Sequence, residues 1–116
     1  MDIQAYPSHL GDPAARRFEA MSYLPQMSAA DIRKQLTYAA SKGNDMVIEH
    51  AAPAYADRTY WHMWKLPFFG ERDIDVILGE VGACAKANPG DHIRICAIDR
   101  VKQTMDFSLV VKRAAA

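Results

Sequence analysis

Residues 60–70, YWHMWKLPFFG, constrain the fold more than any other part of the chain. The segment contains both tryptophans and two of the four phenylalanines. Because aromatic side chains favour a pleated surface, we expect a strand over residues 60–65. Alternation along this strand sorts its side chains onto two faces: Trp61, Met63 and Lys65 on one, and Tyr60, His62 and Trp64 on the other. Both faces are bulky and largely apolar, so each face needs a cover.

The same segment has two interpretations. An aromatic strand in the middle of a small core would explain the tryptophans. It explains less well the apolar run over residues 66–69, where Pro67 cannot donate to a strand ladder. An apolar loop with a rigid proline is more typical of a docking surface. The residues therefore favour an interface with another protein, with the chain's own helices covering the second face.

Two helices are expected from local patterns. The first runs from about residue 29 to 42, with Ser28 as N-cap and Gly43 at its end. Its apolar residues recur at helical spacing: Ile32, Leu36, Ala39 and Ala40. The second has Asp73 and Asp75 in its first turn and stops at residues 88–90. One continuous stripe marks its buried side: Ile74, Ile77, Leu78, Val81 and Cys84.

The order of elements predicts the fold class. Alternating side chains indicate further strands at residues 45–50, 92–98 and 104–111. The order helix, strand, strand, helix, strand, strand predicts an α+β domain, with a four-stranded antiparallel sheet and two helices packed on one face. Residues 1–27 contain prolines and glycine without a sustained period, so we expect an extended N-terminal arm. Residues 28–116 then form a single domain, whose strand order does not follow from the sequence.

Composition narrows the class of protein. A chain of 116 residues is large enough for one domain with a core. Fourteen basic and fourteen acidic residues balance, which argues against a nucleic-acid partner. We expect no membrane partner either, because no apolar run approaches the ~20 residues of a membrane span, and we expect no signal peptide. Cys84 and Cys96 are interpreted as small buried hydrophobes in a reducing compartment, with the cytosol as the default.

The chain shows little sign of a catalytic or metal site. Its four histidines are scattered, and its two cysteines lack the C-x-x-C spacing of a zinc site. The six glycines are dispersed, so a phosphate-binding loop is not expected. Lys65, among aromatics, is interpreted as a cation–π partner or an ion-pair donor to another chain. The acidic side chains of the second helix are interpreted as a solvated face: Glu71, Asp73, Asp75 and Glu80.

The aromatic segment resembles a known family signature. YWxMWKLPFFG at residues 60–70 is similar to the signature of the small subunit of form I ribulose-1,5-bisphosphate carboxylase/oxygenase (RuBisCO). The short loop at residues 51–59 resembles that of bacterial members of the family. Further stretches match in the same order across about residues 16 to 113: Phe18-Glu19, Ser22-Tyr23-Leu24-Pro25, Ala87-Asn88-Pro89, Ile93-Arg94, Asp99 and Gln103. Several matching segments in the same order and spacing indicate the family much more specifically than one segment would.

The resemblance implies a non-catalytic subunit of an enzyme. Such subunits cap and stabilise the octamer of large subunits, eight small on eight large, and modulate carbon dioxide fixation in the Calvin cycle. The active site, with its Mg²⁺ and carbamylated lysine, is expected on the large subunit. This chain is expected to have no catalytic residues and to bind no cofactor or metal. The implied location is the bacterial cytoplasm, and packaging into a carboxysome stays open.

The resemblance also assigns contacts by position. The arm would contact large subunits through Glu19, Ser22, Tyr23, Leu24 and Pro25. The main docking surface would be formed or supported by Trp64, Lys65, Leu66, Pro67, Phe68 and Phe69. The loop lining the central channel, beside neighbouring small subunits, would be Ala51, Ala52, Pro53, Ala54, Tyr55, Ala56, Asp57, Arg58 and Thr59.

Some positions depart from the family pattern. Asn44 stands where many members have a tryptophan, which places the packing near the end of the first helix in question. Other departures are Ala20, Met21, Ala97, Ile98 and Met105. An alternative function is that of a small-subunit-like interaction module that binds RuBisCO in carboxysome assembly. Such modules usually lack the Ser-Tyr-Leu-Pro arm, which this chain has, so the subunit is preferred.

Overall fold

The computed structural model of the protein describes residues 26–56 and 60–114. Its elements are α1 (Ala29–Ser41), β1 (Asp45–Ala51), the 3-10 helix η2 (Pro53–Tyr55), β2 (His62–Met63), α2 (Ile74–Ala87), β3 (His92–Asp99) and β4 (Thr104–Lys112). The expected order of helices and strands is confirmed. The arm contacts predicted at Glu19, Ser22, Tyr23, Leu24 and Pro25 lie outside the described residues, as do Asp57, Arg58 and Thr59.

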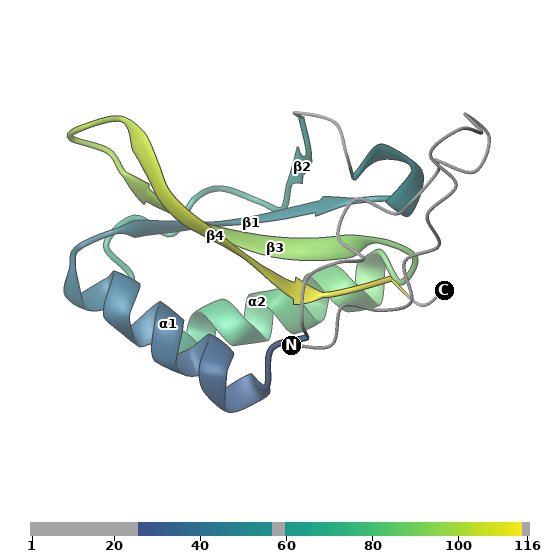
Figure 1. The fold of residues 1–116 in the computed structure, drawn as a ribbon, viewed down its shortest axis with the longest axis horizontal. Helices are drawn as coiled ribbons and strands as arrows, with labels where there is room; N and C mark the ends of the chain where they lie inside the picture. Colours follow the sequence, from purple (N-terminus) through teal and green to yellow (C-terminus); the bar gives the residue numbers. More distant parts are fainter. Residues whose placement is uncertain (1–25, 57–59, 115–116) are drawn as a thin grey trace, which may run out of the picture.

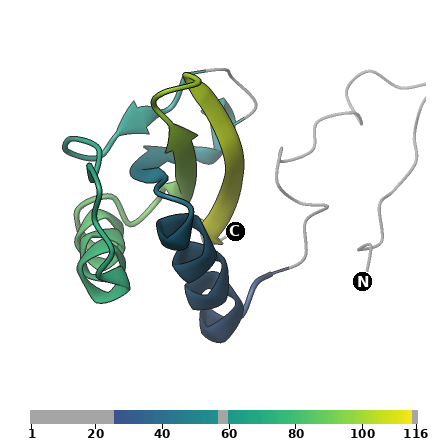
Figure 2. The same cartoon turned by 90° about the vertical axis from the view of Figure 1, so that its left-hand side faces the viewer.

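The strands form one antiparallel sheet in the order β2-β1-β3-β4. Both helices lie against the same face of this sheet, as the two perpendicular views show (Figures 1 and 2). The predicted fold class is therefore confirmed. The sheet order, which the sequence left open, places β2 at one edge beside β1. Among the described residues, neither helix is long and apolar enough to cross a membrane.

Both helices begin at a capping side chain. Ser28 Oγ accepts the Asp31 backbone N–H at 3.1 Å, and Asp73 Oδ1 accepts the Asp75 N–H at 3.0 Å. These caps satisfy donors that the first turn of a helix leaves free. At the other end of α1, Gly43 has φ +80°, a conformation that favours glycine.

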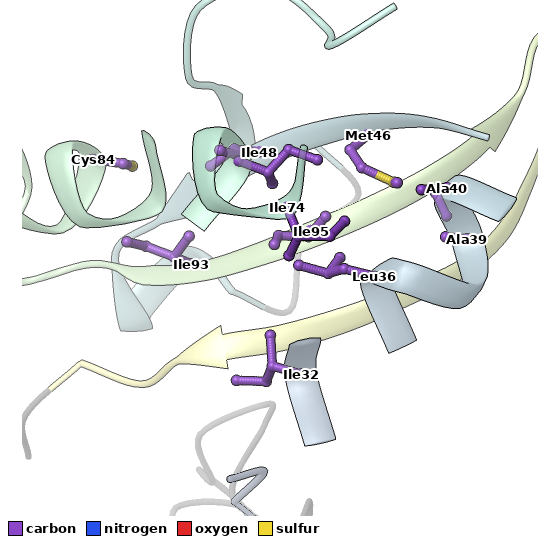
Figure 3. Packing of buried hydrophobic residues seen from close by; sticks show 12 residues of the cluster. Ile32, Leu36, Ala39, Ala40, Met46, Ile48, Ile74, Cys84, Ile93 and Ile95 are labelled. Atoms are coloured by element: carbon purple, nitrogen blue, oxygen red, sulfur yellow. The ribbon is translucent and has the colours of Figure 1, made fainter. Parts of the chain in front are cut away.

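The core lies between the sheet and the two helices (Figure 3). Helix α1 contributes Ile32 and Leu36, and α2 contributes Ile77 and Cys84. The sheet contributes alternate residues of its central strands: Met46, Ile48, Ile93, Ile95 and Ala97. Phe107, Leu109 and Val111 of β4 are partly buried against this cluster. The apolar stripes predicted for both helices therefore do face the sheet.

The aromatic strand is much shorter than predicted. The expected strand over residues 60–65 is wrong in extent, because β2 consists of His62 and Met63 alone, paired with β1. Lys65 has φ 57°, a left-handed conformation that breaks the alternation of a strand. The strand therefore ends, and the chain continues as a loop toward α2.

Asn44, the departure near the end of α1, is accommodated by a hydrogen bond. The side chain is 4% exposed, and its Nδ2 donates to Asp106 Oδ2 of β4 at 2.8 Å. Because this bond stabilises the carboxylate, it lowers the pKa of Asp106 below its usual value. A polar link thus joins the α1–β1 turn to β4 at this departure from the family pattern.

Candidate docking surface

The loop that follows β2 exposes large apolar side chains. We call residues 64–70 the docking loop. Leu66 is 77% exposed and Phe69 is 64% exposed, whereas Pro67 and Phe68 are partly buried. Phe68 packs against the main core. Of the loop's predicted contact residues, Leu66 and Phe69 are therefore the apolar side chains most available to a partner. Phe68 instead attaches the loop to the core.

Main-chain hydrogen bonds attach the docking loop to the edge of the sheet. The Trp64 N–H donates to the Ile48 carbonyl at 2.7 Å, and the Phe68 N–H donates to the Met46 carbonyl at 2.8 Å. Ile48 and Met46 are both fully buried in β1. The loop thus runs beside β1 and continues the edge begun by β2, although it is too irregular to form a strand.

A carboxylate of α2 holds the start of the docking loop. The indole Nε1 of Trp64 donates to Glu80 Oε2 at 3.0 Å, and Lys65 Nζ lies 3.1 Å from Oε1 and 3.0 Å from Oε2. The bond from Trp64, followed by that from Lys65, lowers the pKa of the Glu80 carboxyl. Lys65 Nζ also lies 5.7 Å from the Trp64 ring centroid. The cation–π interpretation of Lys65 is confirmed, and its ion-pair partner here belongs to the same chain.

A second carboxylate holds the end of the docking loop. Asp45, only 2% exposed, accepts the Gly70 backbone N–H at 2.9 Å through Oδ1. Its Oδ2 lies 3.1 Å from Arg100 Nε, and the Arg100 guanidinium lies 5.8 Å from the Phe69 ring centroid. The turn between β3 and β4 therefore contributes a positive charge beside the exposed Phe69.

The two tryptophans lie on opposite faces of the sheet. Trp64 is partly buried against the helix-covered core, whereas Trp61, 8% exposed, belongs to a small cluster with Ala51 and Ala56. The Arg94 guanidinium lies 4.2 Å from the Trp61 ring centroid and pairs with Glu49 at 2.7 Å. The alternation predicted for these two tryptophans is thus confirmed, and the chain itself supplies part of the second cover.

The predicted channel loop is divided between two elements. Ala51 is the last residue of β1, and Pro53–Tyr55 form η2. Ala51 and Ala56 are buried, whereas Tyr55 is 50% exposed. A pocket of about 350 Å³ opens beside this loop, lined by Ala51, Ala52, Tyr55, Tyr60, His62 and Asp91. Near it, His50 Nδ1 lies 2.7 Å from Asp91 Oδ2.

The described residues offer little for catalysis or metal binding. Within residues 26–56 and 60–114, no three His, Cys, Asp or Glu side chains are grouped to hold a metal ion. Both cysteines are buried and free. Burial is the main cause that raises the pKa of Cys84, and it raises that of Cys96 to about 11 with help from Glu49. The arrangement is suited to presenting an apolar loop to another protein.

Comparison with known proteins decides the family. Residues 18–114 match the family described as "Ribulose bisphosphate carboxylase, small chain". The chain belongs to this family. It is 52% identical to the RuBisCO small subunit of Thiobacillus denitrificans over 97% of this chain and 95% of that protein. It is 50% identical to that of Hydrogenophilus thermoluteolus, over 98% and 92%. A solved chain of RuBisCO from Galdieria partita is similar with a TM-score of 0.72 and 29% identity, over 85% of this chain and 73% of that one.

Two residues of this small-subunit chain, Glu80 and Asp45, contact the docking loop, and the sequence did not predict either contact. The interpretation of Glu80 as part of a solvated face is wrong, because its side chain is only 26% exposed and contacts the loop. The sequence predicts Asp45 only as part of a strand. Glu80 follows the buried Ile77 by three residues, at the edge of the apolar stripe of α2. A carboxylate in that position is the signal that could have suggested a contact beyond the helix.

Proposed function

We propose that this chain is a non-catalytic subunit of form I RuBisCO that docks onto the large subunit through residues 64–70. The observation that carries the proposal is an apolar loop, with Leu66 and Phe69 exposed, attached to a well-packed domain. Isolated exposed apolar side chains are common, but two on one fixed loop are typical of an interface. The names of the relatives support the large subunit as the partner.

The finer assembly extends the same proposal. Eight copies cap an octamer of large subunits, with residues 51–59 facing neighbouring small subunits around a central channel. The arm residues Glu19, Ser22, Tyr23, Leu24 and Pro25 add contacts to large subunits. This chain binds no cofactor, and Mg²⁺ and the carbamylated lysine belong to the large subunit. The free, buried cysteines fit a cytoplasmic location in a bacterium.

Such a subunit would influence catalysis indirectly. Catalytic groups must be held within a fraction of an ångström to react efficiently, so a rigid scaffold around them affects rate. Burial of the docking loop against the large subunit would stabilise that scaffold. Loss of apolar packing at this interface would therefore lower turnover without altering a residue that touches substrate.

Co-expression with the large subunit from the same source tests this function. We expect a stoichiometric complex of about half a megadalton, consistent with a closed symmetric oligomer. Carboxylation by the large subunit should depend on this chain. Failure to form a stoichiometric complex, despite two folded chains, would contradict the proposal. Binding only to an already complete RuBisCO assembly would instead indicate the carboxysomal interaction module.

A further inference from the structure

The docking loop contains one residue in an unfavourable backbone conformation. Lys65 has φ 57° and Gly70 has φ 67°. Glycine adopts such angles freely, whereas the side chain of a lysine makes them unfavourable. An unsupported loop would therefore tend to leave this conformation at Lys65. Interactions of the surrounding structure must hold Lys65 in place.

Glu80 supplies that support from a rigid element. Its carboxylate contacts both Trp64 Nε1 and Lys65 Nζ, the latter within 3.1 Å of both oxygens. Helix α2 is anchored on both sides of Glu80, because Ile77 and Cys84 are fully buried. The carboxylate is therefore fixed relative to the core, and it restrains two consecutive residues at the start of the loop.

We propose that Glu80 is a positioning residue, which presets the docking loop in the conformation that binds the large subunit. This inference rests on the proposed function. A loop already ordered in its bound conformation loses less conformational entropy on association, so its affinity is higher. Leu66 directly follows the restrained Lys65 and is 77% exposed, so the restraint on Lys65 helps to set the direction of its side chain.

The fold itself does not depend strongly on this contact. The Glu80 side chain is 26% exposed and that of Lys65 is 60% exposed, so their ion pair contributes little to folding. Asp45 holds the other end of the loop independently, through Gly70. Removal of the Glu80 carboxylate should therefore loosen the start of the loop and leave the core intact.

The experiment compares full-length variants in binding to octamers of large subunits freed of small subunits. Glu80→Ala removes both contacts, whereas Glu80→Gln keeps an acceptor for Trp64 Nε1 and removes the charge facing Lys65. Asp75→Asn is the matched control, because it removes an exposed carboxylate of the same helix that pairs with Arg33 of α1. We expect Glu80→Ala to weaken binding about tenfold, Glu80→Gln to weaken it less, and Asp75→Asn to leave it unchanged. Denaturant midpoints should stay close to that of the wild type.

A double-mutant cycle shows whether Glu80 acts through Lys65. In a Lys65→Met background, Glu80→Gln should have no further effect on binding, because the ion pair is already absent. An undiminished effect in that background would indicate a direct contact of Glu80 with the large subunit and would overturn the inference. Equal binding of Glu80→Ala and wild type would overturn it as well. If wild type itself fails to bind, the proposed function fails first, and the two failures are thereby distinguished.

Discussion

Helix α2 and the docking loop are neighbours that are stabilised in different ways. Helix α2 is defined by local features, with a cap at Asp73 and an apolar stripe that includes Ile77 and Cys84. The docking loop is defined by contacts distant in sequence, to Asp45 and Ile48 of β1 and to Glu80 of α2. The helix turns its apolar side chains inward, whereas the loop leaves Leu66 and Phe69 exposed. We infer that α2 serves the fold and the docking loop serves the partner.

The largest expected effect concerns the helix. Ile77 is fully buried in the core between α2 and the sheet. Ile77→Ala should lower the free energy of unfolding by about 2–5 kcal/mol, because it removes apolar contacts and leaves a cavity. Chemical denaturation of the isolated chain measures this loss. A change below 1 kcal/mol would show that α2 is not the stabilising element described here.

The loop should show the opposite behaviour. Phe69→Ala removes an exposed aromatic side chain, so we expect the free energy of unfolding to change by less than about 0.5 kcal/mol. Binding to the large subunit should weaken by about 2 kcal/mol, as for an aromatic anchor at an interface. Calorimetric or sedimentation titration measures the binding. Full binding by this variant, and by Leu66→Ala, would remove the loop from the interface.

Phe68 offers an internal contrast within the same loop. Its side chain packs against the core, unlike that of Phe69. Phe68→Ala should therefore lower the free energy of unfolding by about 2 kcal/mol, in addition to any effect on binding. Parallel denaturation of the Phe68→Ala and Phe69→Ala variants checks the difference. Equal stability of the two variants would show that both side chains face outward.

The contrast between α2 and the loop also explains what the sequence could predict. The helix boundaries, the N-cap Ser28 and the buried stripe of α2 follow from residues within a few positions of each other, and the structure confirms them. The extent of β2 did not follow, because Lys65 adopts a left-handed conformation and its side chain contacts Glu80, fifteen positions away, which no local pattern reveals. Strand order depends on pairings such as that of β1 with β3, which no local pattern encodes.

The cap of α2 should have a smaller effect than its core residues. Asp73→Ala removes the acceptor of the Asp75 N–H at the start of the helix. We expect the free energy of unfolding to fall by about 1 kcal/mol, the usual loss for a capping side chain. Thermal denaturation with and without the substitution measures it. An unchanged transition would mean that neighbouring groups or water replace the cap fully.

The smallest expected effect is an absence of reaction at the cysteines. Burial raises the pKa of Cys84 and raises that of Cys96 to about 11, so at pH 8 both remain thiols inside the native domain. Because the thiolate is the reactive form, alkylation of the native chain should be negligible and should become rapid on unfolding. Because the pKa of Cys96 is higher in the folded state, folding favours its neutral thiol. The contribution of Cys96 to the free energy of unfolding is therefore lost as the pH rises from about 9 toward 11. Mass spectrometry after pulsed alkylation measures the reaction. Rapid labelling of the Phe69→Ala variant at Cys84 would show that the loop and α2 do not behave independently.

Side-chain footprinting of the full chain, free and assembled with the large subunit, tests the central claim most directly. Hydroxyl radicals modify exposed Phe and Leu side chains, and mass spectrometry locates the products. We expect Leu66 and Phe69 to react in the free chain and to become protected in the complex. Unchanged reactivity of both residues in a fully formed complex would contradict the assignment of residues 64–70 as the docking loop.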